Sequence, residues 1–180
     1  MNVCVFCGSS TGLDSVYADK TRETALLIAE AGHTLVYGGG NIGLMGILAD
    51  TALEAGGRVV GVIPDFLLSR EVGHRGLTEL VVVTSMHERK KRMADMADAF
   101  IALPGGWGTL DELAEILTWR QLGLIDQPIG LLNVESFFSP LVAQMGTMTA
   151  KGFLSPSNLR FLIVENSPAK LLTALGVVTV

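Results

Sequence analysis

The sequence has no excess of basic charge, no long apolar run and few cysteines. Its net charge of −5 argues against a general nucleic-acid binder, since such proteins usually present a basic face. Glycine, proline or charge interrupts each apolar stretch before the ~18 residues that a membrane helix needs. No basic residue precedes Lys20, so a targeting segment is not indicated. We therefore expect a cytoplasmic protein that binds neither nucleic acid nor a membrane.

The only two cysteines, Cys4 and Cys7, form a C-x-x-C pair, which in a βαβ context can indicate a thioredoxin-like redox site. That motif belongs at the start of a helix. Residues 3–7 instead have the pattern of a strand, which points residues three apart to opposite faces. The three histidines are scattered without the spacing of metal ligands. We therefore predict no redox site, no metal and no cofactor.

The 180 residues are 49% apolar, enough for one well-buried core, and we predict a single domain over residues 1–180. Strand-like runs alternate with helical patterns along the chain. The predicted strands are 3–7, 34–37, 59–63, 80–83, 100–103, 129–133 and 161–164, and the predicted helices are 15–31, 44–55, 86–97, 110–122, 137–150 and a short terminal one. This order predicts an α/β fold, a Rossmann-like doubly wound parallel sheet with helices on both faces.

In such a sheet the carboxyl ends of the strands meet at one edge, where ligands bind. Three glycine-containing loops follow predicted strands, at residues 8–10, 38–43 and 104–109. Tight turns alone would explain any one of them. Together they predict a site in which backbone N–H groups hold a phosphorylated ligand.

The third of these loops lies within LPGGWGTLDE, residues 103–112, between an apolar strand and a helical pattern. The free N–H groups at a helix N-terminus attract anions, and glycine lets a phosphate approach the backbone. Thr109 and Glu112 also have the spacing of a capping box, in which they would only satisfy the first donors of the helix. The glycines favour the binding interpretation.

A second interpretation concerns Gly38, Gly40 and Gly43, which match the G-x-G-x-x-G dinucleotide fingerprint, with Asp65 after the next strand. This makes an NAD(P)-binding oxidoreductase a competitor. The motif belongs to the second strand–turn–helix unit, however, and no catalytic tyrosine–lysine or histidine arrangement accompanies it.

The segment TSMHERKKR, residues 84–92, places four cations near the start of a predicted helix. Ser85 and Glu88 have capping-box spacing, which would begin this helix at Met86. Cations at that end oppose the helix dipole. We therefore expect Arg89 to pair with an anion, either a phosphate or the carboxylate of Glu112.

The motifs YGGGNIGLMG, MHERK, PGGWGTLDE and TWRQLG occur in this order, and with them the chain resembles the LOG (Lonely Guy) family of cytokinin riboside 5′-monophosphate phosphoribohydrolases. This family is often mislabelled as lysine decarboxylase. The resemblance covers residues 7–152. It implies hydrolysis of the N-glycosidic bond of an adenine-type nucleoside 5′-monophosphate, including AMP, and it implies a homodimer.

Carried over by position, the resemblance assigns the catalytic roles to Arg89 and Glu112. The family has tyrosine where this chain has Trp107 and glutamate where it has Asp111, which puts fine specificity in doubt. The predicted nucleotide-binding residues are Ser9, Gly39, Gly40, Glu71, Arg89, Lys90, Gly105, Gly106, Trp107, Gly108, Thr109, Leu110, Asp111, Glu112 and Thr118.

In this interpretation Glu112 stabilises an oxocarbenium-like ribose and orients water, and Arg89 keeps Glu112 ionised by lowering its pKa. The proton donor to the leaving base is not identified by the sequence. Two alternatives remain open besides the oxidoreductase. A lysine decarboxylase would need a pyridoxal phosphate Schiff base, for which Lys90 is the only lysine near the site, and a nucleotide or molybdenum-cofactor carrier would bind without turnover.

Overall fold

A computed structural model describes residues 1–68 and 73–178 of the chain. The strands are β1 (Asn2–Phe6), β2 (Thr34–Tyr37), β3 (Arg58–Pro64), β4 (Glu79–Val83), β5 (Ala99–Ala102), β6 (Ile129–Leu132) and β7 (Leu162–Glu165). The helices are α1 (Ser15–Glu30), α2 (Gly43–Glu54), α3 (Asp65–Leu68), α4 (Met86–Met96), α5 (Trp107–Gln121), α6 (Ser139–Ala150), α7 (Pro156–Leu159) and α8 (Pro168–Ala174), with a 3₁₀ turn at Val134–Ser136.

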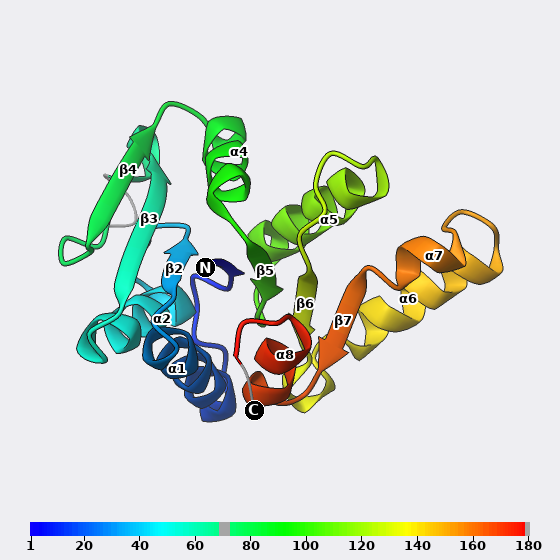
Figure 1. The fold of residues 1–180 in the computed structure, drawn as a ribbon, viewed down its shortest axis with the longest axis horizontal. Helices are drawn as coiled ribbons and strands as arrows, with labels where there is room; N and C mark the ends of the chain where they lie inside the picture. The colour runs from blue at the N-terminus through cyan, green and yellow to red at the C-terminus, as the bar shows by residue number, and fades with distance from the viewer. Residues whose placement is uncertain (69–72, 179–180) are drawn as a thin grey trace.

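The seven strands form one parallel sheet in the order β4-β3-β2-β1-β5-β6-β7 (Figure 1). The central strands β1, β2 and β5 are almost wholly buried, which explains why their sequences are continuous apolar runs rather than alternating ones. In the register of the sheet, Cys4 lies between Val36 of β2 and Phe100 of β5.

Helices cover both faces of this sheet and create two core layers. One layer packs α1, α2 and α8 against one face, and the other packs α4 and α5 against the opposite face (Figure 1). Cys4 belongs to the second layer and Cys7 to the first, so the two thiols are buried on opposite faces and both are free. The predicted α/β fold with a doubly wound parallel sheet is therefore confirmed.

The direction of winding changes between β1 and β5. From β1 the chain adds β2, β3 and β4 on one side, and it then returns to place β5 on the other side of β1 and continues to β7. Neighbouring loops therefore diverge at the carboxyl ends of β1 and β5, which is the usual place for a ligand in such sheets. Of the residues predicted from the sequence, Ser9 follows β1 and residues 105–112 follow β5.

The structure moves one important helix boundary. Helix α5 begins at Trp107, three residues before the predicted start, because Gly106 rather than Thr109 occupies its N-cap position. The short helices α3 and α7 and the 3₁₀ turn are not predicted, since three or four residues carry no helical periodicity. In the described part of the chain, no helix combines the length and the apolar character needed to cross a membrane.

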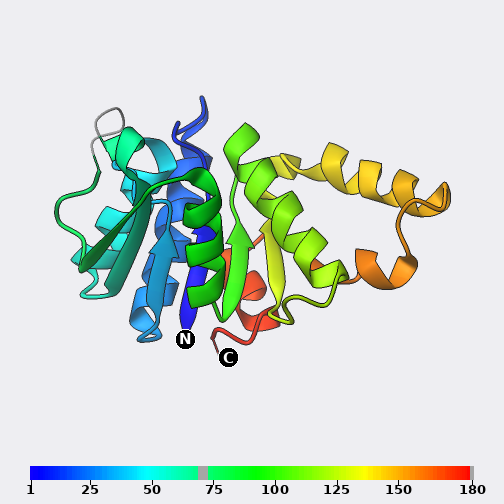
Figure 2. The same ribbon diagram turned by 90° about the horizontal axis from the view of Figure 1, so that it is seen from above.

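Helices α6 and α7 lie at the β7 end of the molecule, beyond the sheet (Figure 2). None of the residues of α6 is fully buried. This helix therefore adds little to the core within one chain.

Candidate active site

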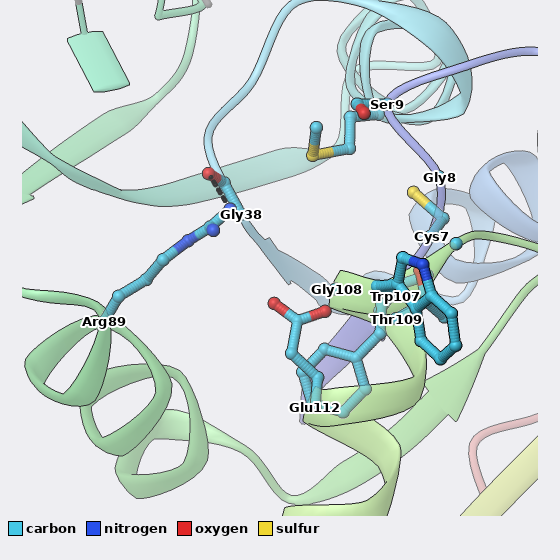
Figure 3. A pocket seen from close by; sticks show the side chains of 13 residues that line it. Cys7, Gly8, Ser9, Gly38, Arg89, Trp107, Gly108, Thr109 and Glu112 are labelled. Atoms are coloured by element: carbon cyan, nitrogen blue, oxygen red, sulfur yellow. Dashed lines mark hydrogen bonds between the residues drawn. The ribbon is translucent and has the colours of Figure 1, made fainter. Parts of the chain in front are cut away.

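A cavity of about 180 Å³ opens at the carboxyl ends of β1, β2 and β5, where the winding of the sheet reverses. Its wall combines two strand ends, the loop after β5 and side chains from α4 and α5 (Figure 3). The lining residues are Val5, Phe6, Cys7, Gly8, Ser9, Gly38, Met45, Arg89, Gly106, Trp107, Gly108, Thr109 and Glu112.

The N-terminus of α5 forms one wall of this cavity. Its N-cap, Gly106, has no side chain to accept from the first N–H groups, so those donors remain available to a ligand. The preceding Gly105 packs against Thr109 and the backbone of Gly8, and a Cβ there would overlap Thr109 Oγ1. The glycines thus bring the β1 and β5 loops together beside a helix N-terminus, an arrangement suited to a phosphate.

The capping box considered for Thr109 and Glu112 does not form. Both residues lie inside α5, and both are buried, at 3% and 9% exposure. Glu112 directs its carboxyl group into the cavity instead of back toward the first turn (Figure 3). The carboxylate is therefore available for chemistry.

Burial dominates the ionisation of Glu112. It raises the pKa of this carboxyl group from 4.5 to about 7, against the positive charges of Arg89 and Lys90, which act in the opposite direction. Arg89 does lower the pKa of Glu112, as expected, but the overall shift is upward, so the expectation that Glu112 stays ionised is wrong. Near neutral pH the carboxyl group exists in both protonation states, which suits a group that exchanges protons during a reaction.

Arg89 enters the cavity from the first turns of α4, and this helix begins at Met86 as predicted. Arg89 is 7% exposed, and its guanidinium group donates from Nη2 to the carbonyl of Gly38 at 2.7 Å and from Nε to the carbonyl of Val62 at 3.1 Å. Carbonyl oxygens of the loop after β2 and of β3, rather than a carboxylate, are thus its partners.

Among the described residues no carboxylate forms an ion pair with Arg89, and Glu112 reaches the cavity from a different helix (Figure 3). The expected Arg89–Glu112 pair is therefore absent. A buried arginine without an anionic partner leaves uncompensated positive charge in the cavity. That charge favours an anionic ligand.

Two predicted binding residues, Lys90 and Asp111, do not line the cavity. Lys90 donates from Nζ to Asp111 at 3.0 Å and also lies 3.3 Å from Glu115. These contacts join α4 to α5. Partial burial lowers the pKa of Lys90, but the hydrogen bonds and charges of Asp111 and Glu115 together outweigh it and raise that pKa. In this arrangement Lys90 and Asp111 join the two helices, and their contact with a ligand stays a prediction.

The remaining predicted residues divide between the cavity and its surroundings. Ser9, Gly106, Trp107, Gly108 and Thr109 line it, as do both predicted catalytic residues. Five do not line it, namely Gly39, Gly40, Gly105, Leu110 and Thr118. Glu71 lies outside the residues that the structure describes.

Each of these five has a structural role in the single chain. Gly105 packs against Thr109, and Leu110 packs against the core layer under α5. Thr118 bonds back to the carbonyl of Ala114 at 2.7 Å, and nine residues of helix separate it from Thr109, or about 13 Å along the axis. Gly39 and Gly40 belong to a loop that holds Arg89 in place.

Six lining residues are not among the predicted site residues, namely Val5, Phe6, Cys7, Gly8, Gly38 and Met45. Gly8 and Gly38 do belong to two of the glycine-containing loops that the sequence places at this edge, and a Cβ at Gly38 would overlap the guanidinium group of Arg89. The first glycine of the supposed dinucleotide fingerprint is therefore required by the protein's own arginine. This removes the main argument for a dinucleotide site.

The lysine positions argue against a Schiff base. All five lysines lie within the described residues, and none of them lines the cavity. Lys90, the nearest by sequence, is held by two carboxylates. Burial also raises the pKa of the Cys4 and Cys7 thiols, which makes both poor nucleophiles.

Comparison with known proteins identifies the family of this chain. A family described as "Possible lysine decarboxylase" matches residues 45–175. Cytokinin riboside 5′-monophosphate phosphoribohydrolase LOG1 of Arabidopsis thaliana is 46% identical over 168 residues, covering 93% of this chain and 78% of that protein. LOG5 of the same plant is 45% identical over 168 residues, covering 93% and 73%.

The chain belongs to the LOG family. Among solved structures, the molybdenum cofactor carrier protein of Chlamydomonas reinhardtii has a TM-score of 0.73 at 20% identity, covering 97% of this chain and 95% of that one. This likeness concerns the fold alone. Within the LOG family, the motifs that carry the resemblance supply α4, α5 and the glycine loop around the cavity.

Proposed function

We propose that this protein hydrolyses the N-glycosidic bond of cytokinin riboside 5′-monophosphates to the free base and ribose 5-phosphate, and that it also accepts AMP. One observation carries this proposal: Arg89 and Glu112 enter the same cavity from two helices, beside the uncapped N-terminus of α5. The membership of the LOG family supports the same reaction.

The 5′-phosphate would bind at the N-terminus of α5. The first N–H groups of the helix lack side-chain acceptors, and the helix dipole is positive at this end. Thr109 lines the cavity and adds a hydroxyl group. This placement fixes the ribose next to Glu112, one turn further along the helix.

Cleavage of an N-glycoside develops positive charge on the ribose. The ionised form of Glu112 would stabilise that charge and would orient or deprotonate the attacking water. A pKa of about 7 is compatible with this role, because a general base works best when its pKa lies near the working pH.

Arg89 would hold the substrate by its charge. Two of its three nitrogens are occupied by the carbonyl groups of Gly38 and Val62, which fix the plane of the guanidinium group. Within the described parts of the chain, the third nitrogen, Nη1, contacts only the sulfur of Met86, at 3.9 Å, and it can donate to a phosphate or hydroxyl oxygen of the nucleotide.

A comparison of three substrates tests this proposal. N6-isopentenyladenosine 5′-monophosphate, AMP and the unphosphorylated riboside are incubated with the protein, and free base and sugar phosphate are quantified by chromatography. We expect both monophosphates to be cleaved and the riboside to be cleaved far more slowly. Equal rates for riboside and monophosphate would contradict the role given to the α5 N-terminus, and no release of base would contradict the activity itself.

We also propose that two copies of the chain associate through the surface around α6. This helix has no fully buried residue, and a further cavity of about 320 Å³ between α5, α6 and α7 is lined mainly by apolar side chains. Phe153, just after α6, is 87% exposed. Burial of such surface by a second copy would remove apolar area from water.

Light scattering after size exclusion tests this association. We expect twice the chain mass of 19.1 kDa for the wild type and a monomer for Met148→Asp with Phe153→Asp. The control is Leu13→Asp, a substitution of a fully exposed apolar residue in the loop before α1. A monomeric wild type would contradict the proposal.

A further inference from the structure

The glycine loop after β2 is held by three different parts of the molecule. The Gly38 carbonyl accepts from Arg89 Nη2 at 2.7 Å, the Gly39 carbonyl from the N–H of His74 at 3.2 Å, and the Gly40 carbonyl from the hydroxyl of Tyr37 at 3.1 Å. Each of these three successive carbonyls thus has its own donor. The loop connects Arg89 on one side to His74 on the other.

His74 is itself fixed by its side chain. It is 8% exposed, and its Nε2 lies 2.8 Å from Asp50 Oδ1. The N–H of Gly76 donates to Nδ1 at 3.1 Å, so in the neutral ring Nε2 carries the proton and donates it to Asp50. Asp50 belongs to α2, the helix that begins directly after the glycine loop.

These contacts connect the glycine loop, α2 and His74 in a closed circuit. The chain runs from Gly39 into α2, Asp50 of α2 holds the imidazole of His74, and the backbone of His74 returns to Gly39. An antiparallel bridge between Gly40 and Gly73 adds to the same connection. Three successive glycines have little stiffness of their own, so fastening from outside determines where their carbonyls lie.

The position of this loop matters to Arg89. The guanidinium group occupies the space where a Cβ of Gly38 would lie, and the Gly38 carbonyl is its shorter hydrogen-bond acceptor. A shift of the loop therefore moves the arginine. His74 and Asp50 do not line the cavity, so they act on it only through the loop.

We propose that His74, oriented by Asp50, is a positioning residue that fixes the glycine loop and thereby sets Arg89 in its working position. The activity readout of this inference rests on the proposed hydrolase function. A second readout, hydrogen exchange of the Arg89 Nε–H group, is independent of that function. This group donates to the buried Val62 carbonyl, so its exchange rate reports the position of the arginine directly.

Substitutions at Asp50 test the inference, because its side chain is 59% exposed and its removal leaves the core intact. Asp50→Ala removes the acceptor of the His74 proton, whereas Asp50→Asn keeps an oxygen in the same place. Glu54→Ala is the matched control, since it removes an exposed carboxylate from the last position of the same helix.

Turnover of N6-isopentenyladenosine 5′-monophosphate and hydrogen exchange of the Arg89 Nε–H group are measured for each variant. The NMR signal is assigned by its loss in Arg89→Lys. We expect Asp50→Ala to lower kcat about tenfold and to speed the exchange, with Asp50→Asn and Glu54→Ala near the wild type. An unchanged melting temperature would separate this effect from a general loss of stability.

Wild-type kcat and wild-type exchange in Asp50→Ala would overturn the inference. An equal loss in Asp50→Asn would also overturn it, since the amide oxygen still accepts the His74 proton. If the wild type cleaves none of the nucleotides, the proposed function fails, and the exchange of the Arg89 Nε–H group alone then decides whether His74 positions Arg89.

Discussion

Replacing Glu112 by glutamine should stabilise the protein at alkaline pH. Glu112 is 9% exposed, and its burial raises its pKa from 4.5 to about 7. A carboxyl group whose folded pKa lies above its unfolded pKa favours the folded state when protonated. Its contribution is present at low pH and is lost as pH rises between the two values.

The magnitude follows from the pKa difference. Each unit corresponds to about 1.4 kcal/mol, so ionising Glu112 in the folded protein costs about 3 kcal/mol relative to the unfolded chain. This cost develops between about pH 4 and pH 8. Glutamine has nearly the same shape but does not ionise, so Glu112→Gln should avoid this cost.

Urea unfolding of both proteins at several pH values measures the effect. We expect the free energy of unfolding of Glu112→Gln, relative to the wild type, to increase by about 3 kcal/mol from pH 4 to pH 8. Glu30→Gln, in which an exposed carboxylate is removed from the last residue of α1, should show no such trend. A flat difference for Glu112→Gln would refute the assignment of a buried carboxyl group with a raised pKa.

Three further predictions concern the surrounding residues. Arg89→Ala should weaken nucleotide binding and slow turnover together, and calorimetry with AMP plus steady-state kinetics would check both; wild-type values would contradict the role of its charge. Gly38→Ala should lower kcat about tenfold or more because its Cβ would displace the guanidinium group, and full activity would show that Arg89 tolerates the shift. Native Cys4 and Cys7 should react slowly with iodoacetamide and rapidly in urea, and fast alkylation of the folded protein would contradict their buried, raised-pKa state.

The fold could be predicted from the sequence because its signals are local. The buried runs of the central strands and the start of α4 at Met86, set by the Ser85 cap, need no knowledge of distant residues. The opposite orientation of Cys4 and Cys7 follows from the geometry of a strand in the same way.

The details of the site depended on distant contacts. Thr109 and Glu112 match a capping box locally, yet packing of the β1 and β5 loops through Gly8 and Gly105 begins the helix at Trp107. This early start carries the Glu112 side chain into the cavity.

The partners of Arg89 are backbone carbonyl groups of the glycine loop and of β3, which side-chain patterns in the sequence do not indicate. The pKa of Glu112 was predicted with the wrong sign for a related reason. The sequence shows the opposite charge of Arg89, but the burial that outweighs this charge arises only in the folded chain, where several distant segments line the cavity around Glu112.

The most direct test of the central claim compares Glu112→Gln with the wild type on one substrate. Both proteins are mixed with N6-isopentenyladenosine 5′-monophosphate, binding is measured by calorimetry, and free base and ribose 5-phosphate are quantified over time. We expect the wild type to release both products in equal amounts, and Glu112→Gln to bind the nucleotide while releasing almost no base. Near-normal release by Glu112→Gln would contradict the account.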